Sequence, residues 1–202
     1  IPDPFYRDNE TEALKLMEYD FHYSRSFEVS RALLDCDAVL LRCEGLDTIA
    51  TVRVNGTVAG FANNMHRVWE FDVKPLLHTG ENTFTVAFAS PTKYIKEAYA
   101  ASVADGSSDA MVGFPHIRKA HCMFGWDWGP RLPDAGIWRD ICILGIEAAR
   151  IEQVHIRQCH ADGRVTCAID TGIDGAAEGL EVSVTVTAPD GKTFEARGAH
   201  CE

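Results

Sequence analysis

The sequence lacks long hydrophobic runs and an excess of positive charge. No apolar segment approaches the roughly 20 residues that a membrane-spanning helix requires. The 202 residues include 19 Lys and Arg against 30 Asp and Glu, which gives a formal net charge of −11. Because nucleic-acid binding depends on clustered Lys and Arg, this charge argues against a nucleic-acid partner. It equally disfavours an anionic membrane surface, so we expect neither nucleic acid nor membrane as a partner.

Paired-cysteine motifs are also absent. The number of cysteines is seven, and no two of them form a C-x-x-C pair. Most lie inside apolar runs, which is typical of buried free thiols in a reducing compartment rather than of disulfides or a zinc site. This pattern favours a cytoplasmic location, although the missing signal peptide says nothing, since both ends look cut from a longer protein. The cysteines are Cys36, Cys43, Cys122, Cys142, Cys159, Cys167 and Cys201.

Motifs for catalysis and cofactor binding are missing as well. No G-x-S-x-G nucleophile elbow occurs, and no Gly-rich loop follows a strand and opens a helix. His116, His121 and Cys122 are close in sequence, but their spacing matches no zinc pattern. If His121 and Cys122 lie on a strand, their side chains point to opposite faces and cannot act as a thiol–imidazole pair. We therefore expect no cofactor, no metal and no catalytic residue in this chain.

The sequence does contain a series of strands with alternating apolar residues, which predicts an all-β fold. Asn55-Gly56 separates two such runs and is a strong hairpin signal, and residues 80–82 (GEN) predict a turn. One helix is predicted after Ser90-Pro91, where apolar residues fall at the spacing of a helix face. Residues 1–18 predict an arm that packs onto the sheet. The predicted strands are 19–29, 38–43, 48–54, 57–61, 68–73, 83–88 and 137–146.

The pattern changes at residues 147–150, where we place a domain boundary. Beyond it, short regular strands joined by tight turns at Asp162-Gly163 and Asp190-Gly191 predict the start of an immunoglobulin-like β-sandwich. The predicted domains are therefore 1–147, the first domain, and 148–202, a partial immunoglobulin-like domain. The strands predicted in the second domain are 151–158, 164–170, 180–188 and 192–199.

Residues 116–139 concentrate aromatic and charged side chains, including three of the four tryptophans. Tryptophan faces cover the C–H patches of a hydroxyl-rich ligand, while Asp and Arg exchange hydrogen bonds with its hydroxyls. The alternative is a loop stapled into the core by its tryptophans. If residues 125–129 are extended, Trp126 and Trp128 share one face and Asp127 points the other way. Asp134 precedes Ala-Gly and is expected to form a turn, so it does not make a catalytic carboxylate pair with Asp127.

Several motifs resemble the N-terminal domain of glycoside hydrolase family 2, and in particular its β-mannosidase branch. They are IPDPFYRDNE, GLDTIATVRVNG, NNMHRVWEFDV and HIRKAHCMFGWDWGPRLPDAGIWRDI, in collinear order over residues 1 to about 147. The resemblance implies a jelly-roll, galactose-binding-like β-sandwich with one short helix. It also implies a longer parent protein in which two glutamates of a downstream TIM barrel hydrolyse terminal β-mannosyl residues with retention.

The resemblance implies roles for particular residues. Asp127 and Trp126 are expected to contact the β-mannoside substrate, with Arg118, Trp128 and Arg131 as further substrate-binding candidates. Trp138 and Arg139 are expected to hold the strand and loop in place. Because the barrel is missing, this chain alone is expected to be inactive. Two other hypotheses stay open: a stand-alone, non-catalytic carbohydrate-binding module, and a structural loop whose tryptophans are core pillars.

Overall fold

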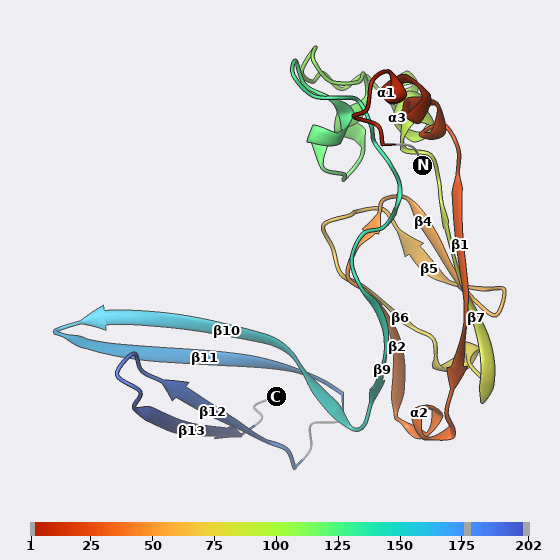
Figure 1. Ribbon diagram of the computed structural model, residues 1–202. Coiled ribbons are helices and arrows are strands. Elements are labelled where there is room, and N and C mark those ends of the chain that lie inside the picture. Colours follow the sequence, from red (N-terminus) through yellow and green to blue (C-terminus); the bar gives the residue numbers. More distant parts are fainter. Residues whose placement is uncertain (1–2, 176–178, 200–202) are drawn as a thin grey trace. The chain divides into compact units, whose positions relative to one another are not determined.

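The computed structural model describes residues 3–175 and 179–199 (Figure 1). Two residues named above, Ile1 and Cys201, lie outside the described residues. The chain divides into two compact units, Ile1–Gly145 and Ile146–Glu202. The assignment of the second unit to a partial immunoglobulin-like domain stays a prediction.

The first unit contains two facing sheets, visible as two layers in Figure 1. One has the strand order β1-β7-β4-β5 and the other has the order β6-β2-β9. The predicted all-β class is confirmed, and each of these strands overlaps a predicted one. The bounds are β1 Phe21–Val29, β7 Gly80–Phe88, β4 Ala50–Val54, β5 Thr57–Ala62, β6 Trp69–Asp72, β2 Ala38–Cys43 and β9 Ile141–Ile146.

The core lies between the two sheets, because alternate residues of each strand point inward. In β2 these are Val39, Leu41 and Cys43, and in β7 they include Val86 and Phe88, all of them buried. Burial of one such side chain stabilises the fold by about 1.5–3 kcal/mol. The period-two pattern of the sequence therefore accounts for the layered architecture.

The β4–β5 hairpin forms at the predicted Asn55-Gly56 turn, where φ is 50° and 80°. The turn predicted at residues 80–82 is wrong, because Gly80, Glu81 and Asn82 already pair with β1. The buried Asn82 carboxamide donates to His78 O at 2.7 Å, so the chain reverses before Gly80. This side chain stabilises a turn that precedes it in the sequence.

Helix α3 (Pro91–Ala101) confirms the predicted helix, and Ser90 Oγ caps it by accepting from the Lys93 amide at 3.2 Å. Two further helices were not predicted. Helix α1 (Asn9–Leu16) buries only Ala13 and so lacks an apolar face, while α2 (Arg31–Asp35) is too short to show a helical period. Within the described residues, no helix has the length and apolarity to cross a bilayer. The 3₁₀ helices are η1 Lys74–Leu76, η2 Phe114–His116 and η3 His121–Phe124.

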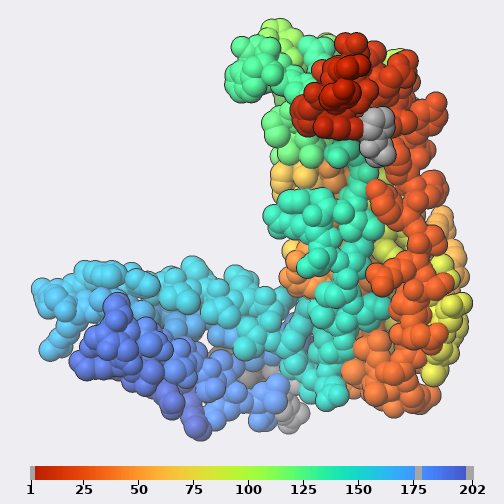
Figure 2. Space-filling view, viewed as in Figure 1, coloured from red at the N-terminus to blue at the C-terminus, as the bar shows by residue number. Residues whose placement is uncertain are grey.

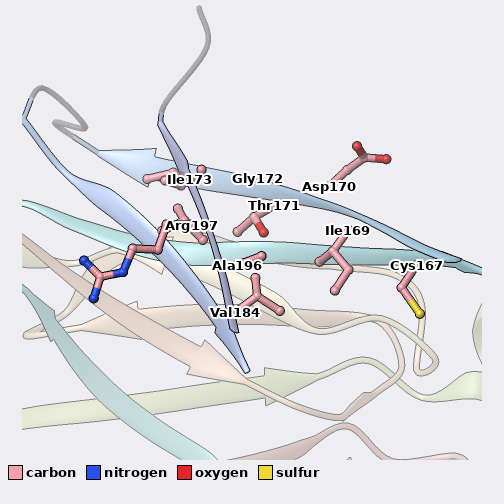
Figure 3. A pocket seen from close by; sticks show the side chains of 11 residues that line it. Cys167, Ile169, Asp170, Thr171, Gly172, Ile173, Val184, Ala196 and Arg197 are labelled. Carbon is pink, nitrogen blue, oxygen red and sulfur yellow. The ribbon is translucent and has the colours of Figure 1, made fainter. Parts of the chain in front are cut away.

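In its described residues, 146–175 and 179–199, the second unit has two hairpins, and its predicted strands are confirmed. They turn at Asp162-Gly163 and next to Gly191, as the sequence predicts. Figure 3 shows a cleft between the hairpins, of about 610 Å³, lined by Ile169, Val184 and Ala196 among others. None of the predicted substrate-binding residues lies in this unit. The strand bounds are β10 Ala149–Ala161, β11 Arg164–Gly175, β12 Glu181–Thr187 and β13 Thr193–Ala199.

Candidate functional site

The tryptophan-rich segment is a long loop of the first unit that ends at a short strand pair. Strand β8 (Gly136–Ile137) pairs antiparallel with β3 (Leu46–Asp47), so the loop returns to the sandwich at this point. Figure 2 shows that the green part of the chain, which includes residues 120–130, protrudes from the surface of the first unit. Glycines and prolines interrupt regular structure throughout the segment.

The centre of the loop is a tight turn at Trp126–Gly129. The Trp126 amide donates to Gly129 O at 3.5 Å, and the Gly129 amide donates to Trp126 O at 3.3 Å. The expectation of an extended segment is therefore wrong, because the backbone closes on itself over these residues. The Trp126 and Trp128 rings meet edge to face, with their centroids 5.7 Å apart. The two indoles are therefore close together because of the turn, and not because they share one face of an extended strand.

The turn exposes its side chains. Trp126 is 45% exposed, Trp128 is 81% exposed, and Asp127 between them is also exposed. The Asp127 carboxylate makes no hydrogen bond or ion pair with any described residue. The structural hypothesis of core pillars is wrong for all three tryptophans, because Trp126 and Trp128 are exposed on the turn and Trp138 is 44% exposed. The result is an unpaired carboxylate flanked by two accessible indoles.

Arg131 lies against the turn. A Cβ on Gly125 would collide with Arg131 Cγ, and Arg131 Nη2 donates to Asp109 O at 3.1 Å. Arg131 also lines a cleft of about 570 Å³ along α3, together with Lys93 and Tyr99. The structure therefore places Arg131 in the same loop region as Trp126, Asp127 and Trp128.

Arg118 shares no hydrogen bond, ion pair or ring contact with this turn among the described residues. It is exposed, and its backbone forms a parallel bridge with Asn64. Among the described residues, its side chain has no hydrogen bond, ion pair or ring contact. The structure does not link Arg118 to the other four predicted residues, and its role in binding stays a prediction.

Two residues at the base of the loop were missed by sequence reasoning. Lys119 is fully buried, and its ammonium group pairs with Asp47 Oδ2 and lies 3.6 Å from Asp134 Oδ1. The other oxygen of Asp47 accepts a hydrogen bond from the Thr48 hydroxyl. No sequence pattern predicts the ion pair between Lys119 and Asp47, because Lys119 lies in a basic run and Asp47 is 72 positions away.

Trp138 and Arg139 have the contacts of supporting residues. Trp138 Nε1 donates to Met65 O at 3.3 Å, and the Arg139 guanidinium lies 4.1 Å from the centre of the Trp138 ring. Gly45 packs against the same indole, where any Cβ would collide with the ring. These contacts agree with the expectation that the two residues hold the strand and loop in place.

Two side chains of the sandwich, Cys43 and Arg42, have shifted pKa values. Burial raises the pKa of the Cys43 thiol to about 12, with a smaller contribution from Cys142. The side-chain hydrogen bond to Glu70 raises the pKa of Arg42, which lies in the sheet. Within the described ranges, no group of three or more His, Cys, Asp or Glu side chains could hold a metal ion. The exposed turn offers hydrogen bonding and ring contacts to a ligand.

Comparisons with known proteins agree with the motifs. Residues 1–139 match the family model described as glycosyl hydrolase 2 galactose-binding domain-like. The β-mannosidase of Capra hircus is 34% identical over 172 residues, which cover 79% of this chain and 18% of that protein. The crystal structure of β-D-mannosidase from Dictyoglomus thermophilum is similar with a TM-score of 0.88 and 31% identity, over 98% of this chain and 25% of that one.

A more distant structure extends the likeness of fold. Bifidobacterium dentium β-glucuronidase has a TM-score of 0.64 at 22% identity, over 91% of this chain and 32% of that one. The chain thus spans between 18% and 32% of the length of these proteins. The galactose-binding-like β-sandwich expected from the motifs is confirmed. Because the family model covers residues 1–139 of the 202, the chain belongs to the glycosyl hydrolase 2 galactose-binding domain-like family.

Proposed function

We propose that this chain is the N-terminal part of a retaining, β-mannosidase-like glycoside hydrolase and that its Trp126–Arg131 segment lines the terminal sugar subsite. The observation that supports this most is the exposed, unpaired Asp127 carboxylate between two accessible indoles. The similarity to β-mannosidases of Capra hircus and Dictyoglomus thermophilum supports a β-mannoside as the ligand.

The turn suits a pyranose in its chemistry. An ionised carboxylate has only acceptor oxygens, so Asp127 accepts hydrogen bonds from one or two sugar hydroxyls. Such charge-assisted bonds are roughly twice as strong as neutral ones. The indole of Trp126 covers a C–H face of the sugar, which removes apolar surface from water. Together these contacts orient a terminal sugar.

Bond cleavage requires groups that lie elsewhere in the proposed parent protein. Retaining hydrolysis uses one carboxyl group as acid and base and a second as nucleophile, about 5–5.5 Å apart. The resemblance assigns both to glutamates of a downstream TIM barrel. The role of this chain is to bind the sugar and orient it toward the two glutamates, so its residues affect the reaction by positioning the substrate.

The role of Asp127 is tested by Asp127→Ala in the full-length enzyme that contains this chain. Loss of a charged hydrogen-bond partner is expected to weaken transition-state stabilisation by about 2–4 kcal/mol. This corresponds to a decrease in kcat/KM for an aryl β-mannoside of roughly 30- to 1,000-fold. Asp105→Ala is the matched control, because Asp105 is also exposed and makes no hydrogen bond or ion pair with the described residues. Rates near wild type for Asp127→Ala would overturn the proposal.

The exposure of Trp128 favours a second candidate function, a carbohydrate-binding module that acts alone. Calorimetric titration of the isolated 202-residue chain with a β-mannoside separates the two. A module binds with a dissociation constant below about 1 mM. The proposed function requires weaker binding by the isolated chain and tighter binding by the full-length enzyme, because one wall of a pocket excludes little water.

A further inference from the structure

The two ends of the tryptophan-rich loop meet at one buried ammonium group. Lys119 lies near the start of the loop and Asp134 near its end, and their charged atoms lie 3.6 Å apart. Lys119 also pairs with Asp47, which stands on β3 opposite Gly136 of β8. One lysine therefore connects the start of the loop, the end of the loop and the strand pair that receives it.

The environment of Lys119 makes this connection specific. Its side chain has no exposed surface, and that of Asp47 is 4% exposed. A buried ammonium group has lost its hydration, so it must keep its carboxylate partner or leave the interior. The Thr48 hydroxyl occupies the second oxygen of Asp47 and fixes the plane of the carboxylate. The ion pair therefore has one favourable geometry.

Apolar contacts do not fill the space around this connection. A cavity of about 230 Å³ lies beside it, lined by Asp47, Met65, Met123, Asp134 and Trp138 among others. Because no protein atoms fill this cavity, the loop base is not held by close packing on that side. The directional contacts at that point include the ion pairs of Lys119, the hydrogen bond from Trp138 to Met65 O and the hydrogen bond from the Ala120 amide to Met65 Sδ.

We propose that Lys119 is a positioning residue for the Trp126–Arg131 segment. Through Asp47 and Asp134 it sets where the turn stands relative to the sandwich, and thereby where Asp127 and Trp126 meet the sugar. This inference rests on the proposed function of the segment. Lys119 itself does not touch the substrate, so its effect reaches the reaction through the loop.

The test compares Lys119→Met with Val86→Ala in the full-length enzyme, at a temperature where both are folded. Val86 is buried in β7, so its truncation lowers stability without touching the loop. A misplaced loop is expected to reduce kcat/KM for an aryl β-mannoside by about 10- to 100-fold, mainly through KM. Val86→Ala is expected to keep wild-type values. If Lys119→Met behaves like Val86→Ala, the inference is overturned.

A milder variant covers the case in which Lys119→Met does not fold. The Asp134 side chain is 67% exposed, so Asp134→Asn is expected to keep the fold while it removes one of the two charges. We expect KM to rise only about threefold, since an exposed ion pair contributes little to the energy that holds the loop. An unchanged KM for Asp134→Asn would also overturn the inference.

Failure of this inference and failure of the proposed function are distinguishable. Amide hydrogen exchange of the 202-residue chain does not depend on substrate: Lys119→Met is expected to speed exchange in residues 120–135 and to leave β4, β5 and β7 as protected as in wild type. If Asp127→Ala leaves kcat/KM unchanged but Lys119→Met speeds exchange in residues 120–135, the proposed function fails. The role of Lys119 in holding the loop then stands. If Asp127→Ala is damaging and exchange is unchanged, only the inference fails.

Discussion

Lys119 and Asp47 lie 72 positions apart in the sequence and form an ion pair in the interior of the first unit. Neither residue belongs to the group that the sequence suggests for substrate binding. Their pairing nevertheless fixes the base of the loop that carries Trp126 and Asp127. The stability and the site of this unit are therefore connected through one buried contact.

Lys119→Met is expected to lower the free energy of unfolding of the 202-residue chain by about 3–5 kcal/mol, because it leaves the Asp47 carboxylate buried without its counter-ion. Adding Asp47→Leu removes that carboxylate, so the double variant is expected to be more stable than Lys119→Met alone. Urea denaturation followed by tryptophan fluorescence measures both effects.

Arg31→Met is the control for that experiment. Arg31 and Asp35 form an exposed pair at 2.9 Å, for which we expect a change of no more than about 0.5 kcal/mol. A loss in Lys119→Met no larger than in Arg31→Met would show that the buried pair contributes nothing to stability.

Asn82→Ala is expected to destabilise the first unit by about 1–3 kcal/mol, because it removes the buried carboxamide that bonds several partly buried groups of the turn. The Asn82 carboxamide donates to His78 O at 2.7 Å and Gly80 O at 2.8 Å, and it accepts from Asn55 Nδ2 at 2.8 Å. Asn63→Ala is the control, since Asn63 is exposed. Equal thermal midpoints for the two variants would contradict this account of the turn.

The Cys43 thiol is expected to resist alkylation in the native chain at pH 8. Burial raises its pKa to about 12, so the reactive thiolate is scarce. The expectation of buried thiols is wrong for Cys122, Cys142, Cys159 and Cys167, which are exposed. Cys122 serves as the internal comparison. Mass spectrometry after iodoacetamide treatment should find Cys122 modified first, and Cys43 modified only in denaturant. Similar rates at both positions in the folded chain would contradict the buried assignment.

The raised pKa of the Cys43 thiol is expected to make the free energy of unfolding decrease as pH rises above about 9. Its folded pKa lies above the ordinary value of 9.0, so its contribution is complete below pH 9 and is lost as pH rises toward about 12. In that window the slope is about −1.4 kcal/mol per pH unit. Urea unfolding at pH 8 and pH 10 should show a smaller decrease for Cys43→Ala than for wild type. An identical decrease would mean that Cys43 does not titrate differently on unfolding.

Gly125→Ala is expected to distort the turn. Gly125 has φ 96° and ψ 167°, a region that only glycine adopts freely, and entering it costs another residue about 1–3 kcal/mol. The new Cβ also displaces Arg131, whereas at Gly56 (φ 80°) it meets no atom within 4 Å. We expect Gly125→Ala to reduce kcat/KM of the full-length enzyme and Gly56→Ala to leave it unchanged. Equal activities would argue against a role for the shape of the turn.

Local patterns predicted most of the sandwich. Alternation along β2 and β7 and the Asn55-Gly56 turn are signals within a few residues, and the structure follows them. Helix α3 was predictable for the same reason, since Ser90 supplies a cap and Ile95 marks the buried face. Helix α1 was not, because its single buried residue, Ala13, leaves no periodic apolar face.

The site was predictable only in part. Motifs drew attention to Trp126 and Asp127, but the alternation rule for extended strands failed where the backbone closes between Trp126 and Gly129. Lys119 and Asp47 gave no signal, because their partnership depends on how distant segments meet in the folded chain. Contacts of this kind follow from tertiary structure and leave no spacing to detect.

The central claim, that Asp127 holds a terminal sugar, is tested most directly by a crystal structure of the full-length enzyme with a bound β-mannoside. We expect a carboxylate oxygen of Asp127 to lie within about 3.2 Å of a hydroxyl of the terminal sugar, which is the distance of a hydrogen bond. We also expect the Trp126 ring to contact the same sugar. A sugar bound with Asp127 more than about 6 Å from every hydroxyl, beyond even a bridging water, would contradict the account.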